Sequence, residues 1–140
     1  MTEIKLDLDT AHSHQGLLRL ARSRNWEQVF MEGHPGFGKL RVQSVQVSRT
    51  SPGHYHVLIA VSNEIPPEYL TFLQLALGSD VAREMLNRRR ILTCPEQEHW
   101  NLFFPMKLNA RGQVISQEKL DMRLSKQVRD IIRQHQRVKK

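Results

Sequence analysis

Cysteine, aromatic residues and long apolar runs are all scarce in this sequence. The single cysteine, Cys94, excludes an intrachain disulfide and any zinc site built from several cysteines. No segment approaches the roughly 18 consecutive apolar residues of a membrane-spanning helix, so we expect no membrane partner. Aromatic residues make up only 6% of the chain, which argues against a sheet that binds nucleic acid mainly by stacking bases.

The chain also lacks a glycine-rich phosphate loop and a targeting signal. The segment richest in glycine, residues 33–38, has neither the Walker A spacing nor the dinucleotide-binding spacing. The first residues, Met1 to Ile4, show no basic region followed by an apolar one. We therefore expect a cytoplasmic protein without a nucleotide-binding loop of these two classes.

What the chain does have is an excess of basic charge. Its 21 Lys and Arg residues face 14 Asp and Glu residues, which gives a formal net charge of +7. Such an excess favours a polyanion as partner, because phosphates release counterions when cationic side chains bind them. A basic protein that binds another protein is the alternative. We rank nucleic acid first, with DNA ahead of RNA and with nucleotides as further ligands.

The hydrophobic pattern predicts one α+β domain. Alternation of apolar and polar residues predicts strands over residues 3–9, 40–49 and 54–62, and residues 100–104 are predicted to form a short buried strand. Helical spacing predicts helices over residues 15–24, 66–77, 80–91 and from about 117 onward. We expect Ser13 to cap the first of these, Pro66 and Pro67 to start the second, Gly78 to end it, and Ser79 and Asp80 to cap the third. This order predicts an RRM-like or ferredoxin-like antiparallel sheet with helices on one face.

We divide the chain into a nucleic-acid-processing core, residues 1–113, and a basic amphipathic C-terminal helix, residues 114–140. The helix over 80–91 carries apolar residues at Val81, Met85 and Leu86. In the tail the apolar face is predicted to contain Leu120, Leu124, Val128 and Ile131.

Two carboxylates lie on one face of the first strand. Because successive strand residues point to opposite faces, Asp7 and Asp9 share the face that Ile4, Leu6 and Leu8 leave free. Carboxylates two residues apart suit Mg²⁺ or Mn²⁺, which prefer oxygen ligands. The alternative is an ordinary solvated face of an edge strand.

A second strand carries two histidines with the same spacing. His54 and His56 share one face, while Tyr55 and Val57 take the other. Two imidazoles in register suit a divalent metal, or one imidazole can contact a phosphate. We assign His54 to the metal and His56 to catalysis and nucleotide contact.

Basic residues near these strands and on the helix over 80–91 are candidates for phosphate contact. Arg49 and Ser51 flank the hairpin turn and are predicted to bind nucleotide. Arg83, Asn87 and Arg90 share a helical face and predict a basic ridge. The predicted nucleic-acid contacts are Arg83, Asn87, Arg88, Arg89, Arg90 and Lys107.

The aspartate strand, residues 6–9, followed by residues 49–56, resembles the first two motifs of the archaeo-eukaryotic primase (PrimPol-like) superfamily. That resemblance covers roughly residues 4–107. It implies that Asp7 and Asp9 bind the catalytic Mg²⁺ or Mn²⁺ and that Ser51 and His56 hold the triphosphate. Residues 75–89 and 100–104 are similar to small proteins of phages, archaeal viruses and plasmids. Such primases usually carry a third acid on a later strand, and residues 100–107 contain none.

A competing resemblance is to HUH-type nickases and replication initiators. It implies that His54 and His56 bind the metal and that Tyr69, on a helix, attacks the scissile phosphate. A non-catalytic nucleic-acid-binding module is a third possibility. The leading expectation is a DNA-binding, metal-dependent nucleotidyltransferase that acts in replication of a virus or mobile element. The sequence leaves the oligomeric state open.

Overall fold

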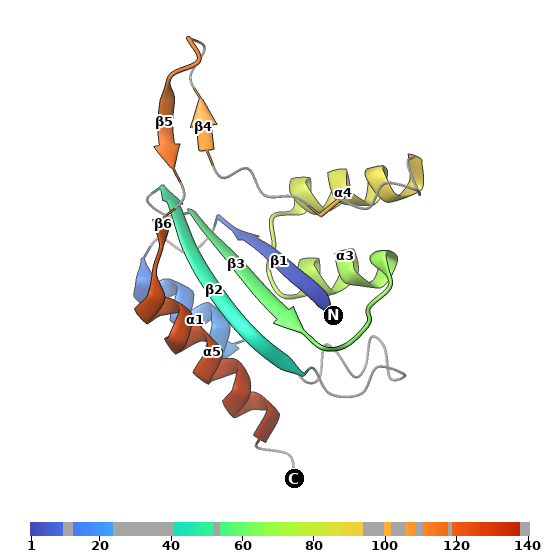
Figure 1. Cartoon of the computed structure of the whole chain (residues 1–140), viewed down its shortest axis with the longest axis vertical. Helices are drawn as coiled ribbons and strands as arrows, with labels where there is room; N and C mark the ends of the chain where they lie inside the picture. The colour runs from blue at the N-terminus through green and yellow to red at the C-terminus, as the bar shows by residue number, and fades with distance from the viewer. Residues whose placement is uncertain are drawn as a thin grey trace.

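A computed structural model describes residues 1–9, 13–23, 41–51, 54–93, 100–101, 106–108, 111–117 and 119–137. Its elements, drawn in Figure 1, are β1 (Thr2–Leu8), α1 (His14–Ser23), β2 (Val42–Ser51), β3 (His54–Val61), α3 (Pro67–Ala76), α4 (Val81–Thr93), β4 (Met106–Leu108), β5 (Val114–Gln117), β6 (Lys119–Leu120) and α5 (Met122–Arg137).

Four of the strands form an antiparallel sheet in the order β1-β3-β2-β6. Because β1 and β2 are each antiparallel to β3, they run parallel to one another with β3 inserted between them. This split arrangement is compatible with a ferredoxin-like layout and confirms the α+β class. The remaining strands, β4 and β5, form a separate antiparallel pair.

Several local predictions are confirmed by hydrogen bonds and backbone angles. The Ser13 hydroxyl accepts the Gly16 N–H at 3.0 Å, as expected for a residue that caps α1. Pro66 precedes α3, and Gly78 ends that region with a φ of 104°, which favours glycine. At the start of α4, Asp80 Oδ2 accepts the Arg83 N–H at 3.0 Å.

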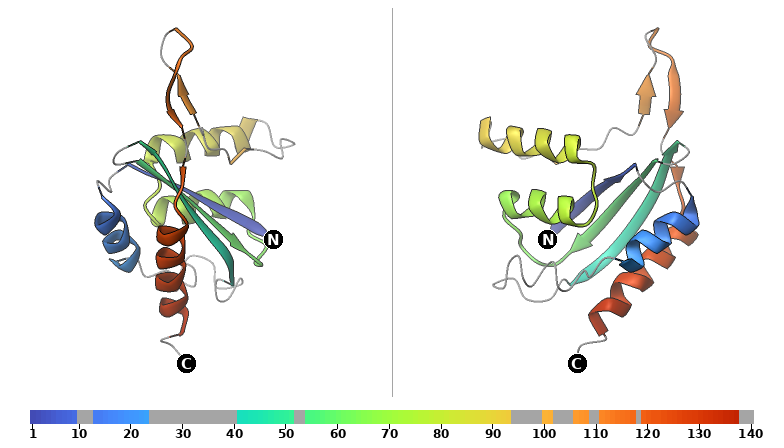
Figure 2. Two further views of the ribbon diagram at one scale, coloured as in Figure 1. Left: turned by 60° about the vertical axis from the view of Figure 1, so that its left-hand side comes forward. Right: turned by 180° about the vertical axis from the view of Figure 1, so that it is seen from behind.

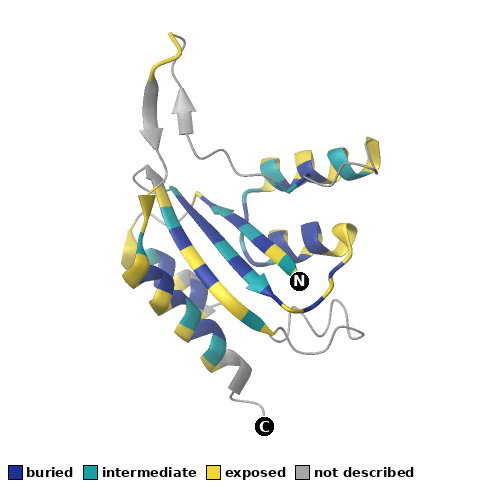
Figure 3. Cartoon of the chain, in the orientation of Figure 1, coloured by how far each residue is buried: buried dark blue, intermediate teal, exposed yellow. Residues whose placement is uncertain are grey.

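The main core lies on one face of the sheet. Alternate residues of the three long strands supply its sheet side: Ile4, Leu6, Leu8, Val45, Val47, Tyr55, Val57, Ile59 and Val61. Helices α1 and α5 cover this face with Leu17, Leu18, Ala21, Leu124, Val128, Ile131 and Ile132. Figure 3 shows the consequence for the strands: central β3 is mostly buried, whereas β2 alternates between buried and exposed residues.

The expectation that all helices lie on one face is wrong. Figure 2 shows α1 and α5 on one side of the long strands and α3 and α4 on the other. The second pair lies along the free edge of β1, because its side chains hydrogen-bond the outward backbone groups of that strand. The Lys5 N–H donates to Gln74 Oε1 at 2.9 Å, and the Asp7 N–H donates to Ser79 Oγ at 3.0 Å.

The outward carbonyls of β1 are satisfied in the same way. Arg83 Nη1 donates to the Lys5 carbonyl at 3.0 Å, and the Asp80 N–H donates to the Asp7 carbonyl at 2.7 Å. An edge strand normally leaves such groups free to pair with another chain. Here two helices take the place of a neighbouring strand, so the β1 edge is closed.

The C-terminal region differs from its prediction. Residues 114–117 and 119–120 form strands, so helix α5 begins only at Met122. Leu120 is exposed on β6, while the other predicted apolar positions of the tail are buried. Trp100 and Asn101 are not in a strand, and the rest of that predicted strand lies outside the described residues.

Candidate functional site

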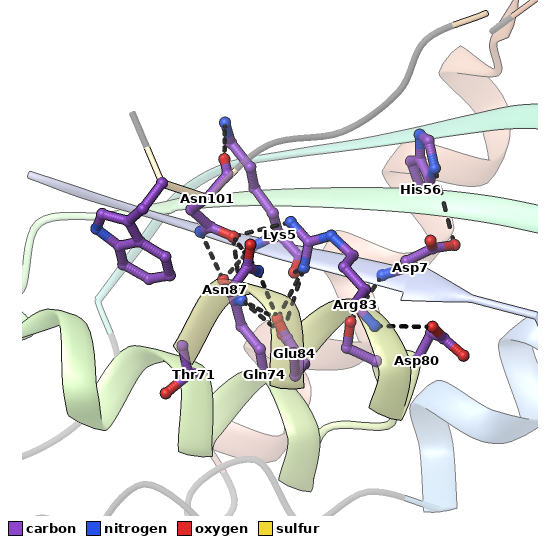
Figure 4. A network of polar contacts seen from close by, with 12 residues as sticks. Lys5, Asp7, His56, Thr71, Gln74, Asp80, Arg83, Glu84, Asn87 and Asn101 are labelled. Atoms are coloured by element: carbon purple, nitrogen blue, oxygen red, sulfur yellow. Dashed lines mark hydrogen bonds and ion pairs between the residues drawn. The ribbon is translucent and has the colours of Figure 1, made fainter. Parts of the chain in front are cut away.

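The pairing of β1 with β3 brings the two acids and the two histidines together. Asp7 lies directly opposite His56 in the register, and Asp7 Oδ1 is 3.8 Å from His56 Nε2 (Figure 4). One step further along the strands, Asp9 Oδ1 is 2.7 Å from His54 Nδ1. Two neighbouring Asp–His pairs therefore occupy one end of the polar face of the sheet, and we call these four residues the Asp–His cluster.

The two pairs differ in their exposure to solvent. His56 is 6% exposed, whereas His54 and Asp9 are each more than a third exposed. Asp7 lies between these extremes. The cluster thus extends from the interior at His56 to the solvent at Asp9.

Asp7 has a strongly perturbed acidity. Its pKa is raised from 3.8 to about 6, and the largest cause is partial burial, which removes solvation of the carboxylate. The charge of Asp9 and a hydrogen bond between the two carboxyl groups contribute to the same rise in pKa, while Arg83 opposes it. Perturbed groups of this kind collect at functional sites, although structural networks also produce them.

The donor set of the cluster is compatible with a divalent cation held by two carboxylates. Two crowded carboxylates repel each other when both are ionised, and a cation between them relieves that repulsion. Among the described residues, no group of three or more His, Cys, Asp or Glu side chains is arranged around one point. Mg²⁺ commonly uses only one or two protein carboxylates, together with waters and substrate phosphates.

Asp80 is the nearest candidate for a third acid. The sequence places it at a helix cap but gives no sign that it lies near Asp7. In the structure its N–H donates to the Asp7 carbonyl, and its charge contributes to the raised pKa of Asp7. Its carboxylate caps α4 through the Arg83 N–H. Asp80 therefore acts first as a structural residue that ties α4 to β1.

The strand β2 meets the cluster through a residue that the sequence analysis did not select. Ser48 is the β2 residue opposite His56, whereas Arg49 lies opposite Tyr55. Arg49 therefore takes the other face of the sheet and cannot neutralise phosphates held beside Asp7, contrary to the predicted arrangement. Ser51 pairs with His54 in the register.

The predicted basic ridge on α4 does not form on the surface. Asn87 is fully buried, and the Arg83 side chain is only 9% exposed. Arg90 is half-buried and donates to Asn87 Oδ1 and to the Trp100 carbonyl. The remaining two basic residues of that run, Arg88 and Arg89, are exposed.

Arg83 and Asn87 belong instead to a buried polar network beside β1, which Figure 4 shows. At its centre is Glu84, whose carboxylate accepts hydrogen bonds from Gln74, Arg83 and Asn87. Burial raises the pKa of Glu84 and lowers that of Arg83. Sequence reasoning missed Gln74 because an uncharged amide within an apolar helix gives no functional signal.

Two predicted residues remain, Tyr69 and Lys107, and neither is placed at the Asp–His cluster. Gln74 contacts Lys5 while Ser79 contacts Asp7, so α3 runs toward the cluster from its N-terminal end. Tyr69, near that N-terminal end, is therefore roughly 14 Å from Asp7 along the strand and helix axes. Lys107 lies in β4, where the side chains are outside the described residues.

None of the helices described here combines the length and apolarity that crossing a membrane requires. Comparison with known proteins finds no matching family model, no similar curated protein and no similar solved structure.

Proposed function

We propose that this protein binds nucleic acid and carries out metal-dependent nucleotidyl transfer at the Asp–His cluster. The observation that carries the proposal is the β1–β3 pairing, which places Asp7 opposite His56, together with the contact between Asp9 and His54 just beyond it. The primase-like resemblance of the same two strands supports it. We infer DNA as the substrate and a virus or mobile element as the setting.

Each residue of the cluster has a separate part in this proposal. Asp7 and Asp9 would hold a Mg²⁺ or Mn²⁺ ion. When bound, this ion would stabilise the charge that develops on the transferred phosphoryl group. Asp7 is positioned by its backbone, whose N–H donates to Ser79 and whose carbonyl accepts from Asp80. The buried imidazole of His56 faces Asp7 and would contact a substrate phosphate.

Nucleic acid would be held by exposed cations at the same end of the sheet, on the face opposite the Asp–His cluster. Arg49 on β2 and Lys119 on β6 are direct cross-strand neighbours, and both side chains are exposed. Like charges placed opposite each other destabilise a sheet unless an anion lies between them. The first turn of α5 adds Arg123, and the next turn adds Lys126. We infer that a phosphodiester backbone follows these four residues.

The test is a primer-extension assay on a denaturing gel, with labelled single-stranded or primed DNA, dNTPs and either Mg²⁺ or Mn²⁺. Wild-type protein should lengthen the DNA, and Asp7→Asn should reduce the product at least about a hundredfold, as losses of transition-state stabilisation often do. The matched control is Asp130→Asn, which removes an exposed carboxylate on α5 and should leave extension unchanged.

An unchanged ladder with both metals would contradict the proposal and leave a non-catalytic binding module. Shortened DNA with label linked to the protein would indicate a nickase instead. The nickase alternative is weakened by the position of Tyr69, which the helix α3 holds far from His54 and His56. Tyr69→Phe would therefore have no effect on extension.

A further inference from the structure

Helix α4 has its polar and apolar sides reversed. Its inner side carries Glu84, 3% exposed, and Asn87, fully buried, whereas Val81 and Met85 are each 62% exposed and Leu92 is 65% exposed. Folding normally buries apolar side chains and leaves charged ones in water. The sequence pattern suggested no such reversal, because periodicity does not tell which side of a helix is covered. In Figure 3 the outer side of α4 is correspondingly marked as exposed.

The exposed apolar residues of α4 follow the spacing of a helix–helix seam. Val81, Met85, Arg88 and Leu92 are separated by four, three and four residues. This is the alternation of a and d positions in a heptad repeat, which forms a stripe along one side of a helix. The stripe is about 16 Å long, which is three turns of helix and enough for a partner helix to pack against. We call these four residues the α4 seam.

The neighbouring helix enlarges the same type of surface. Tyr69, Phe72 and Leu75 of α3 are exposed, and Leu86 is exposed on α4 outside the seam. Of the ten exposed large hydrophobic residues in the described part of the chain, seven lie on α3 and α4. Single exposed apolar residues are normal on a protein surface, but such a concentration marks an interaction site.

The charge in the seam indicates the chemistry of the partner. Arg88 occupies a seam position and Arg89 follows it, and among the described residues no carboxylate forms an ion pair with either. A polar residue at a seam position selects its partner through the group placed opposite. The seam is otherwise aliphatic, so it offers no stacking surface for bases and fits a protein helix better than single-stranded nucleic acid.

We propose that the outer side of α4 binds an amphipathic helix of a partner protein, which packs apolar residues on Val81, Met85 and Leu92 and places a carboxylate opposite Arg88. The arrangement is a helix docked on an exposed seam, anchored at residues three and four apart. The α4 seam is defined by exposure and spacing along the helix, and it does not rest on the reaction proposed at the Asp–His cluster. Helix α4 would then have apolar contacts on its outer side and the polar network on its inner side.

The test uses a designed peptide of about three heptads with leucine at the a and d positions and one glutamate at the position that faces Arg88. Binding is measured by fluorescence anisotropy against the full chain, with a scrambled peptide of the same composition as reference. Met85→Glu should weaken binding at least about tenfold, as loss of a central interface residue does. Met122→Glu, at an exposed methionine on α5, should leave binding unchanged.

A charge exchange gives the sharper test. The Arg88→Glu variant should no longer bind the glutamate peptide. It should instead bind a peptide in which that glutamate is replaced by lysine. Because the substituted side chains are exposed, circular dichroism should show an unaltered fold for every variant.

Three outcomes would overturn the proposal. Equal binding of the scrambled peptide would mean that the surface binds apolar peptides non-specifically. Self-association of the wild type that Met85→Glu abolishes and the peptide does not displace would identify a second copy as the occupant. Binding of labelled single-stranded DNA that Met85→Glu weakens, with no binding of either peptide, would assign the surface to nucleic acid.

Discussion

The raised pKa of Asp7 links the candidate site to the stability of the fold. The folded protein holds the Asp7 proton up to about pH 6, whereas the unfolded chain releases it near pH 4. Between these values the folded state binds more protons, so its stability falls as the pH rises from about 4 to about 6. At neutral pH the ionised Asp7 therefore destabilises the fold that positions it.

Replacing that carboxylate should then stabilise the protein. We expect Asp7→Asn to increase the free energy of unfolding by about 1 to 3 kcal/mol at pH 7.5 and to leave it nearly unchanged at pH 4. Urea unfolding at the two pH values measures the difference, with Asp130→Asn as the reference. The same change at both pH values would show that ionisation of Asp7 is not the cause. A stabilised variant that has lost activity would also separate catalysis from folding.

At the scale of secondary-structure elements, the closed edge of β1 depends on Gln74. This fully buried amide accepts the Lys5 N–H and donates to Glu84. We expect Gln74→Ala to lower the free energy of unfolding by about 2 to 4 kcal/mol, because it leaves buried polar groups without partners. Hydrogen exchange gives a local measurement: the Lys5 amide should exchange slowly in the wild type and fast in the variant. A slow Lys5 amide in both would show that another group protects this edge.

The same elements show what the sequence could and could not predict. Local signals placed the cap at Ser13, the start of α3 after Pro66 and the end of that region at Gly78, because each depends on neighbouring residues. The pairing of Asp7 with His56 depends on which strands become neighbours, which local pattern does not determine. The reversal of α4 had the same origin, since Val81 and Met85 give the same periodicity whether covered or exposed.

At the scale of the whole molecule, the net charge of +7 should dominate association with DNA. We expect the logarithm of the binding constant to fall linearly with the logarithm of salt concentration, with a slope of about −0.9 for each phosphate contacted. Arg49→Ala and Lys119→Ala should each reduce the magnitude of that slope by about one. Anisotropy titrations at several salt concentrations measure it. A binding constant that does not depend on salt concentration, or variants with the same slope as the wild type, would contradict the proposed contacts with the DNA backbone.

Helix α4 connects the α4 seam with strand β1, which carries Asp7 of the Asp–His cluster. Its outer side bears the α4 seam. Its N-terminal end is attached to β1 by two hydrogen bonds: the Asp80 N–H, just before the helix, donates to the Asp7 carbonyl, and the Arg83 guanidinium donates to the Lys5 carbonyl. If a docked partner shifts α4, the hydrogen-bonded residues Lys5 and Asp7 of β1 shift with it. The affinity of the Asp–His cluster for its ligand would then change with occupancy of the seam, and thermodynamic linkage requires an equal effect in the opposite direction. The helix that closes the sheet edge would thus also be the route by which a partner protein regulates the site.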